Sequence, residues 1–458
     1  MDFSKMEPYK IKMVERLKTT TKEERKKFIK EAKYNLFNLK SRNVLIDLLT
    51  DSGTNAMSDE QWSEIMLGDE SYAGADSYFK LKDAIKELFG FEYFLPTHQG
   101  RAAENVLFSA LIEEGDIVPG NAHFDTTKGH IESRKADAVD CTIDAAYDTS
   151  TYHPFKGNID LNKLKKVFDE NDNEKIPFVI HTVTCNSAGG QPVSMENIKK
   201  VSEFCKKQDT LLFFDAARFA ENSYFIKERE EGYKNKKIRE IIKEMFSYVD
   251  GFTMSCKKDG IVNIGGLIGL RDKKIYQEAS VYNIMYEGYL TYGGMAGRDL
   301  GALSQGLKES SKYSYLKSRI GQVQYLADKL EEYSIPIQKP VGGHAVFIDA
   351  KKFFPHIPQS QYPAQLLGVE LYIEGGIRGV EIGTLLADRD PKTGKNRYPD
   401  LEFLRLAIPR RVYTNNHMDF VAETLKKIYE NREKYDKGLK IVREAPILRH
   451  FTVELERL

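Results

Sequence analysis

The sequence predicts an α/β protein that has a mostly parallel sheet in a large domain and a second, smaller α+β domain. From about residue 75 to residue 270, short apolar strand-like segments alternate with helical segments. These strands lack a clean alternation of polar and apolar residues, which indicates that both faces of the sheet are covered. After residue 297 the pattern changes to a long helix over about 298–333, followed by shorter mixed elements.

The N-terminal third begins with one helix and one strand. A threonine at 20 or 21 is followed three residues later by a glutamate, which is a capping-box pattern, so a helix is predicted over 20–36. The apolar segment VLIDLL at 44–49 predicts a strand that ends in the turn TDSGTN.

The remaining elements follow from hydrophobic period and turn residues. In the alternating region we predict helices at 77–90, 101–114, 194–208 and 236–247, and strands at 93–96, 178–184, 211–215, 251–255 and 265–270. In the last third we predict strands at 344–350, 401–409 and 448–457, and helices near 361–375 and 416–433.

Composition excludes several classes of protein. The 458 residues are 41% hydrophobic and 30% charged, which is a globular composition. Lysine plus arginine (68) equals aspartate plus glutamate (68), so neither a nucleic acid nor an anionic membrane is an expected partner. Four cysteines without a C-x-x-C pair indicate reduced thiols. The charged N-terminus has no secretory pattern, and the apolar runs are far shorter than the ~20 residues of a membrane span, so we expect a cytoplasmic protein.

A possible phosphate site follows the strand at 93–96. Gln99, Gly100 and Arg101 open the next helix, where backbone N–H groups and a cation would face an anion. An ordinary turn between a strand and a helix explains the same residues equally well.

A carboxylate stands at the end of the apolar strand LLFFD. Burying the charge of Asp215 at such a position costs free energy unless the carboxylate has a partner. Arg218 could pair with it as a purely structural ion pair. Alternatively, Asp215 could hold the protonated ring nitrogen of a cofactor.

The strand at 251–255 ends in Ser255 and is followed by the adjacent lysines Lys257 and Lys258. A lysine that forms an imine must be uncharged, and a neighbouring cation lowers its pKa. A solvated basic turn is the simpler interpretation of two lysines alone. However, a phosphate turn, then a strand-end aspartate, then a lysine about forty residues later is the linear order of a pyridoxal phosphate (PLP) site.

Eight longer strings extend this pattern over nearly the whole chain. They are IDLLTDSGTNAMSD (46–59), GDESYAG (68–74), PTHQGRAAEN (96–105), NSAGGQPVS (186–194), DAARFAEN (215–222), SCKKDGIVNIGG (255–266), PVGGHAVFIDA (340–350) and RLAIPRRVYT (405–414). With these strings the chain resembles the β-eliminating lyases, the family that includes tryptophan indole-lyases and tyrosine phenol-lyases.

The resemblance implies the aspartate-aminotransferase-like PLP fold, fold type I, in a homotetramer. It also implies a division of the chain into an N-terminal arm (1–19), a large PLP-binding domain (57–310) and a small domain built from both chain ends (20–56 and 311–458).

The resemblance further implies the roles of individual residues. Lys258 would form the imine with PLP, Asp215 would pair with the ring nitrogen, and Phe124 would stack on the ring. The cofactor would also contact Gln99, Gly100, Arg101 and Ser255 at its phosphate, and Asn186 and Arg218 beside its ring. Arg405 would hold the substrate carboxylate, with Thr50 and Ser52 nearby, and Tyr72 would be the general acid at the leaving group. Family members are activated by potassium, for which Glu70 and the carbonyls of Gly53 and Asn263 would be the ligands.

Three positions bear on which aromatic amino acid is cleaved. Phenol-lyases use an arginine in the small domain, whereas this chain has Val380 and Ile382 in that segment. Asp125 replaces a threonine next to Phe124, and His450 replaces a phenylalanine. Each residue alone has a structural explanation, but together they favour the apolar, partly hydrogen-bonding site that indole requires.

We therefore predict β-elimination of L-tryptophan to indole, pyruvate and ammonia, with side activity on cysteine, serine and S-alkylcysteines. Lys258 would remove the Cα proton, and Tyr72, helped by Asp125 and His450, would protonate the leaving group. The alternatives are a tyrosine phenol-lyase, a cysteine desulfhydrase, a PLP transaminase, or a protein that keeps the fold without activity.

Overall fold

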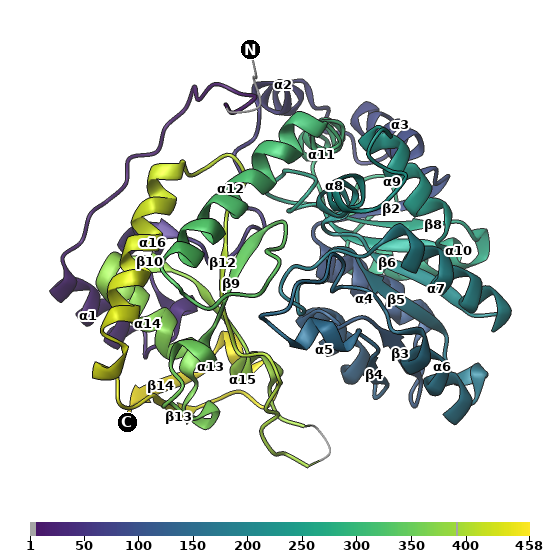
Figure 1. Cartoon of the computed structure of the whole chain (residues 1–458). Coiled ribbons are helices and arrows are strands. Elements are labelled where there is room, and N and C mark those ends of the chain that lie inside the picture. Colours follow the sequence, from purple (N-terminus) through teal and green to yellow (C-terminus); the bar gives the residue numbers. More distant parts are fainter. Residues whose placement is uncertain (1–5, 391–392) are drawn as a thin grey trace. The chain divides into compact units, whose positions relative to one another are not determined.

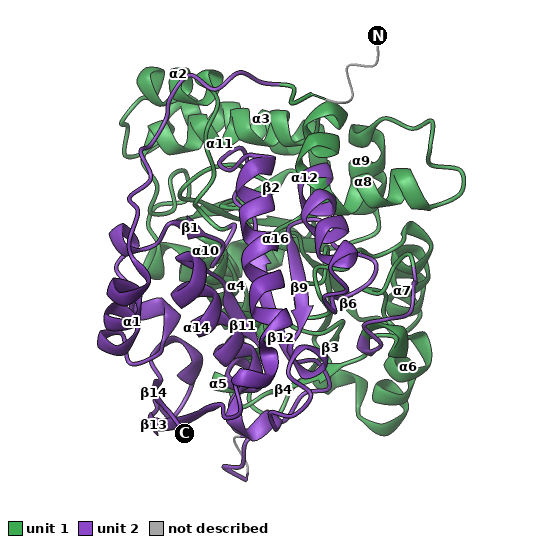
Figure 2. Ribbon diagram, turned by 60° about the vertical axis from the view of Figure 1, so that its left-hand side comes forward, with its two compact units in different colours: residues 1–8, 52–146, 154–320 green, residues 9–51, 147–153, 321–458 purple. Residues whose placement is uncertain are grey.

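The computed structural model describes residues 6–390 and 393–458. These residues form two compact units (Figure 2). Of the described residues, unit 1 contains 6–8, 52–146 and 154–320, and unit 2 contains 9–51, 147–153 and 321–458.

The limits of the units differ from the predicted limits of 57–310, 20–56 and 311–458. Unit 1 begins at residue 52 because the backbone N–H of Gly53 and the side-chain amide of Asn55 both donate to the carbonyl of Lys257, each over 2.8 Å. It extends to residue 320 because Leu316 and Ile320 pack into its hydrophobic core.

Two further segments join unit 2. Residues 147–153 belong to it because the Thr149 hydroxyl donates to Asp349 over 2.7 Å and the Thr149 carbonyl accepts from the N–H of Lys339. Residues 9–19 of the predicted arm contain no helix or strand and are also grouped with unit 2. Residues 1–5 of that arm lie outside the described part of the chain.

A seven-stranded sheet forms the centre of unit 1 (Figure 1). Its strands are β2 (Tyr93–Thr97), β3 (Ile117–Gly120), β4 (Asp137–Asp140), β5 (Phe178–Thr182), β6 (Leu211–Asp215), β7 (Gly251–Ser255) and β8 (Gly266–Leu270). The order is β2-β8-β7-β6-β5-β3-β4, and only β8 runs antiparallel to its neighbours. The prediction of a mostly parallel sheet is confirmed.

Helices cover both faces of this sheet. One hydrophobic cluster is formed with α3 (Asp76–Phe89), α6 (Leu161–Glu170), α7 (Met195–Lys207), α8 (Phe219–Arg229), α9 (Ile238–Ser247) and α11 (Gly297–Ser310). The opposite cluster is formed with α4 (Gly100–Leu111), α5 (Asp125–Ser133) and α10 (Lys273–Tyr286). Unit 1 also contains α2 (Asp59–Leu67), which packs on α11.

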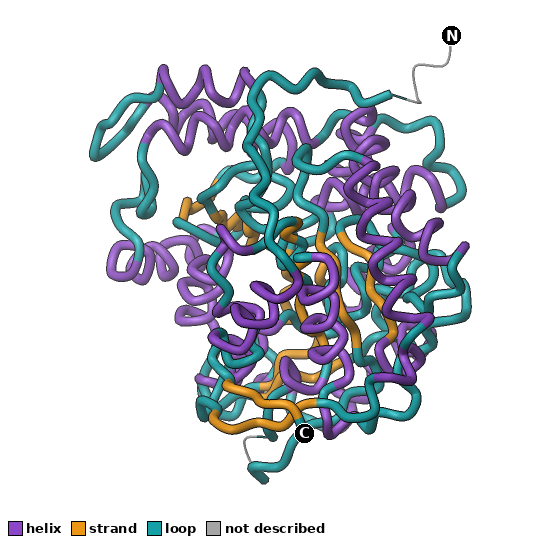
Figure 3. The backbone as a smooth tube through the Cα atoms, turned by 90° about the vertical axis from the view of Figure 1, so that its left-hand side faces the viewer, coloured by secondary structure: helices purple, strands orange, loops and turns teal. Residues whose placement is uncertain are grey.

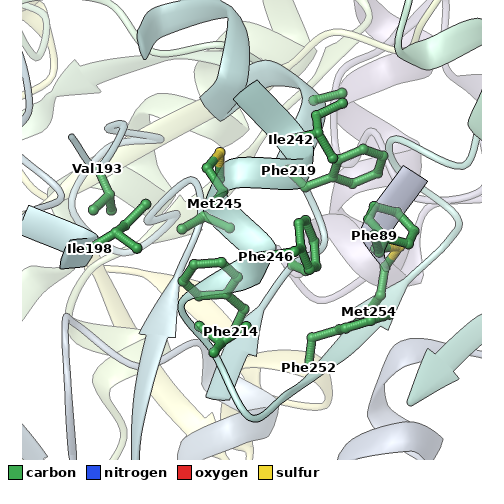
Figure 4. Packing of buried hydrophobic residues seen from close by; sticks show 14 of the residues in the cluster. Phe89, Val193, Ile198, Phe214, Phe219, Ile242, Met245, Phe246, Phe252 and Met254 are labelled. Carbon is green, nitrogen blue, oxygen red and sulfur yellow. The ribbon is translucent and has the colours of Figure 1, made fainter. Parts of the chain in front are cut away.

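Successive side chains of the central strands enter opposite clusters. On β6, Phe213 lies in the cluster with α4, whereas Phe214 lies in the cluster with α9. Figure 4 shows Phe214 among Phe246, Met245 and Phe252. Burial on both faces explains why the strand sequences are apolar throughout.

In its described residues, unit 2 contains three small sheets and the helix α14 (Pro363–Gly375), most of whose residues are buried. Figures 1 and 3 show the course of the chain. The three-stranded antiparallel sheet has the order β11 (Val380–Ile382), β12 (Phe403–Ala407), β9 (Ala345–Asp349). Two-stranded pairs are formed by β1 (Ile46–Asp47) with β10 (Ile377–Arg378) and by β13 (Leu439–Arg443) with β14 (Glu454–Arg457). The helices are α1 (Lys22–Glu31), α13 (Ala350–Phe353), α14 (Pro363–Gly375), α15 (Thr384–Ala387) and α16 (Asn415–Glu430).

Most predicted elements are present, with two clear differences. The helix predicted over 298–333 is two helices, α11 and α12 (Tyr313–Glu332), because α11 ends at Ser310 and Lys312 interrupts the run. The predicted strand 448–457 is a 3-10 turn at Arg449–Phe451 followed by the shorter β14. Among the described residues, no helix combines the length and the hydropathy needed to cross a bilayer.

Candidate active site

A pocket in unit 1 lies where strand ends meet helix starts. Its lining includes the residues predicted to contact the cofactor, together with one predicted substrate residue: Gln99, Gly100, Arg101, Phe124, Asn186, Asp215, Arg218, Ser255, Lys258 and Ser52. They come from segments spread over more than 200 positions of the chain, and the carboxyl ends of parallel strands bring them together.

The start of α4 provides a site for an anion. Its N-cap residue Gln99 makes no side-chain cap hydrogen bond, so the first N–H groups of a twelve-residue helix open toward the pocket. A Cβ on Gly100 would lie 2.5 Å from the Cβ of Ser255, so only glycine allows this approach of helix and strand. Arg101 and Lys257 add cationic groups, and burial together with Arg101 lowers the pKa of Lys257.

Asp215 ends β6 inside the same pocket. Burial raises the pKa of its carboxyl group, whereas Lys258, a hydrogen bond of 3.2 Å from the N–H of Ala217, and Arg218 lower it. A carboxylate held between cations can stabilise a protonated ring nitrogen.

The lysine predicted to form an imine lies over an aromatic ring. The Nζ atom of Lys258 is 5.8 Å from the ring centroid of Phe124. The turn that carries Lys258 is held by the two hydrogen bonds that Gly53 and Asn55 donate to the neighbouring carbonyl of Lys257.

The sequence analysis missed five polar residues of the pocket: Glu104, Thr126, Thr182, Thr184 and Thr253. Glu104 lies four residues after Gly100 on α4, which places both on one face of the helix. That spacing in GRAAEN was the available signal. The buried hydroxyl of Thr184 also lines the pocket and has no hydrogen-bond partner among the described residues.

The pocket as a whole fits PLP. It combines an anion site at a helix N-terminus, a strand-end carboxylate, an aromatic ring and a lysine, which are the groups that this cofactor needs.

Unit 2 brings its predicted substrate residues together. Arg405 on β12 lies opposite Val380 on β11, and its Nη2 atom donates to the carbonyl of Leu49 over 3.1 Å, one residue before Thr50. Val380 and Ile382 are buried in one apolar cluster.

His450 is buried in unit 2 and makes an edge contact with Phe37, with ring centroids 5.0 Å apart. Burial and the positive charge of Arg405 lower the pKa of His450 to about 3. Burial and Glu402 raise the pKa of Glu381, whose carboxyl lies 3.8 Å from the His450 ring. Near neutral pH His450 is therefore uncharged.

Two predicted acid–base residues of unit 1, Tyr72 and Asp125, do not line the pocket. Tyr72 is 72% exposed and packs against Tyr289 and Tyr292 at ring-centroid distances of 5.9 and 5.2 Å. Asp125 lies between the pocket residues Phe124 and Thr126, and its Oδ1 atom accepts from the N–H of Thr126 over 2.6 Å. Their predicted roles stay predictions.

Two of the predicted potassium ligands, Glu70 and the carbonyl of Gly53, have protein partners. Glu70 pairs with Arg298 at 2.7 Å, and the carbonyl of Gly53 accepts from the side-chain amide of Asn263 over 2.9 Å. Residues 6–390 and 393–458 contain no cluster of three or more histidine, cysteine, aspartate or glutamate residues suited to a metal. Potassium binding stays a prediction.

Comparisons with known proteins agree with this geometry. The family model described as beta-eliminating lyase matches residues 47–424. A probable beta-eliminating lyase of Trichomonas vaginalis is 62% identical over 100% of both chains, and the tyrosine phenol-lyase of Pasteurella multocida is 53% identical over 98% of both.

A solved aromatic aminotransferase from Pyrococcus horikoshii has a TM-score of 0.62 at 13% identity, over 85% of this chain and 97% of that one. This likeness shows the fold, the aminotransferase-like PLP fold type I, as predicted.

The comparisons are less favourable to the predicted indole-lyase activity. Relatives from Pasteurella multocida, Clostridium tetani and Nostoc punctiforme, which are 49–53% identical to this chain, are named tyrosine phenol-lyases. These names favour the alternative prediction, a tyrosine phenol-lyase, over the predicted tryptophan indole-lyase. The pocket and the sequence matches agree with each other. The chain belongs to the β-eliminating lyase family.

Proposed function

We propose that the protein catalyses PLP-dependent β-elimination of an aromatic L-amino acid, with cleavage of a carbon–carbon bond. The observation that carries the proposal is the pocket in which Lys258 and Asp215 lie beside the N-terminus of α4, in a chain of this family. When bound, PLP would supply an aldehyde for the substrate amine and a ring that accepts electrons.

The chain's own residues would position the reactants and move protons. Gly100, Arg101 and Ser255 would hold the phosphate, and Asp215 would keep a proton on the ring nitrogen. The amine of Lys258 would remove the Cα proton of the substrate. Arg405 would hold the substrate carboxylate through two parallel hydrogen bonds.

The leaving group requires an acid. A hydrogen bond with Tyr292 raises the pKa of Tyr72, which keeps its phenol protonated at neutral pH. Tyr72 would donate that proton to the departing ring, while a neutral His450 would contribute a hydrogen bond. General acid catalysis typically contributes about 10²–10⁴-fold to a rate.

Tyrosine is the substrate that the relatives favour. Several named relatives are tyrosine phenol-lyases, and the matches cover almost the whole chain. On this basis phenol, pyruvate and ammonia would be the products.

Tryptophan is the second candidate, and three residues of the chain favour it. Val380 and Ile382 lie in a buried apolar cluster, in the segment where phenol-lyases of the family use arginine. Asp125 and His450 replace a threonine and a phenylalanine. A site built to bond a hydroxyl rejects ligands that lack it by about 10⁴–10⁵-fold, whereas an apolar site rejects an added hydroxyl only weakly, by about 10²-fold. The ratio of the activity on tyrosine to the activity on tryptophan therefore reports which kind of site is present.

One experiment tests the proposal and separates the candidates. The purified protein is loaded with PLP and supplied in parallel with L-tyrosine, L-tryptophan and S-methylcysteine, and phenol, indole and pyruvate are measured. Aryl product from either aromatic substrate supports aromatic β-elimination. Pyruvate from S-methylcysteine alone would favour the desulfhydrase alternative, and amino transfer to an oxo acid without pyruvate would favour the transaminase.

The assembly and the cation belong to the same proposal. Helix α2 exposes Trp62, Met66 and Leu67 at 46%, 85% and 70%, which supports burial of this surface in a homo-oligomer such as a tetramer. The mass in solution, and turnover in potassium compared with sodium, test these two parts separately.

A further inference from the structure

The pocket contains a carboxyl group that the proposed function does not use. Glu104 on α4 is 5% exposed and lines the pocket together with Asp215. A buried carboxylate is unfavourable unless hydrogen bonds or charges compensate it. The groups around the Glu104 carboxyl therefore indicate which role it has.

The Glu104 side chain connects two helices. Its Oε2 atom accepts a hydrogen bond from the hydroxyl of Thr126 over 2.7 Å, and its Oε1 atom accepts one from Thr127. Both threonines belong to the first turn of α5, whose N-cap residue Phe124 makes no side-chain cap hydrogen bond. The contact with Glu104 thus fixes the turn that carries Phe124, the ring that faces Lys258.

The charge of Glu104 is linked to that of Asp215. Burial raises the pKa of Glu104, Asp215 raises it further, hydrogen bonds from the two threonines lower it, and Asp125 raises it, with a result of about 7. Asp215 has the nearby cations Lys258 and Arg218, whereas Glu104 has hydroxyl groups as its partners. Burial raises the pKa of both carboxyl groups, and a negative charge on Asp215 further disfavours a negative charge on Glu104.

The charged groups around Glu104 come from several elements. Asp215 ends β6, Asp125 begins α5, and Arg101 precedes Glu104 by one turn on α4. Lys257 and Lys258 follow β7 and line the same pocket. Among the residues that line the pocket, the two that carry carboxyl groups are Glu104 and Asp215.

We propose that Glu104 is a positioning residue that fixes the first turn of α5 and whose ionisation is linked to that of Asp215 in the same pocket. Its consequence for catalysis rests on the proposed PLP chemistry, because an ionised Asp215 is what a protonated ring nitrogen requires. The carboxyl groups of Glu104 and Asp215 are coupled, because ionisation of Glu104 places a second negative charge near an ionised Asp215.

The first test uses the protein without cofactor. The infrared carbonyl band of a protonated carboxylic acid is followed against pH, and the Glu104 band is assigned by its loss in Glu104→Gln. In Asp215→Asn, which removes a neighbouring negative charge, the midpoint should fall by about one pH unit. In Thr127→Val, which removes a hydrogen bond to the ionised form, it should rise by about as much.

A matched control is Glu244→Gln. Glu244 lies in unit 1, outside the lining of the pocket, and its partners are Lys199, Lys236 and Tyr233. This variant should leave the Glu104 midpoint unchanged. An unchanged midpoint in Asp215→Asn, or the absence of any band that Glu104→Gln removes, would overturn the inference.

The second test uses the holoenzyme. Glu104→Gln keeps the size of the side chain and can still bond the threonine hydroxyls, but it cannot ionise. The pH midpoint of the cofactor's visible absorption should move by roughly one pH unit relative to the wild type, whereas Glu244→Gln should match the wild type. Superimposable profiles for Glu104→Gln and the wild type would overturn the inference. A protein that takes up no PLP would instead refute the proposed function, while the cofactor-free titration would still decide the role of Glu104.

Discussion

The buried carboxyl of Glu104 predicts a specific dependence of stability on pH. The perturbation is Glu104→Gln, studied in the protein without cofactor. In the folded chain the pKa of Glu104 is raised from 4.5 to about 7, first by burial and then by Asp215. Because the folded pKa lies above the unfolded one, the contribution of this group to stability is complete below pH 4.5 and is lost as the pH rises through 7.

The size of the effect follows from that shift. At about 1.4 kcal/mol per pH unit, the whole shift corresponds to about 3 kcal/mol, of which about 2 kcal/mol is lost between pH 5 and pH 7.5. A change of 1 kcal/mol moves the melting temperature of a large domain by roughly 2–4 °C. The difference in melting temperature, Glu104→Gln minus wild type, should therefore increase by about 4–8 °C over this range.

The assay is thermal unfolding of three proteins at closely spaced pH values. Glu244→Gln is the control: burial raises the pKa of Glu244, but hydrogen bonds from Lys199 and Lys236 outweigh burial and lower it to about 2. Glu244 is therefore ionised in both states above pH 5, and its difference from the wild type should stay constant. If the Glu104→Gln difference is equally constant, Glu104 does not hold a proton near neutral pH and the reasoning fails.

Three further predictions concern the pocket. Lys258→Ala should abolish covalent attachment of PLP and lower turnover by at least about 10²–10⁴-fold; unchanged turnover would remove Lys258 from the proton transfer. Asp125→Asn should reduce cleavage of the aromatic substrate far more than cleavage of S-methylcysteine, whose thiolate needs no ring protonation; an equal loss on both would exclude Asp125 from leaving-group chemistry. Gly100→Ala should weaken PLP binding by about tenfold or more, because the new Cβ would lie 2.5 Å from the Cβ of Ser255; binding of wild-type strength, measured by equilibrium dialysis, would show that helix and strand can separate at no cost.

The fold could be predicted well from local patterns. The strand at 211–215 is observed with the predicted limits, because a buried strand between two helix layers is apolar at every position. The capping box at Thr21 and Glu24 is also present, since it depends only on neighbouring residues. By contrast, the break between α11 and α12 was missed, because apolar residues continue on both sides of it.

The candidate site was also only partly predictable from the sequence. Sequence motifs alone identified the glycine turn at Gly100, the strand-end Asp215 and Lys258, and the resemblance they carried indicated the β-eliminating lyase family that the comparisons show. The preference for tryptophan over tyrosine was inferred from the identities of a few residues outside the lining of the pocket, and the names of relatives favour the other substrate.

Tertiary structure alone decided which groups share a microenvironment. Glu104 is an ordinary helix residue in the sequence, and it becomes a titrating group only because folding buries it beside Asp215 and under the hydroxyls of Thr126 and Thr127. The pKa of His450 likewise falls to about 3 only because folding buries the ring and places it near Arg405. A linear sequence specifies which ionisable groups are present, but their pKa values depend on desolvation and on charges from distant segments, and only the folded chain brings these together.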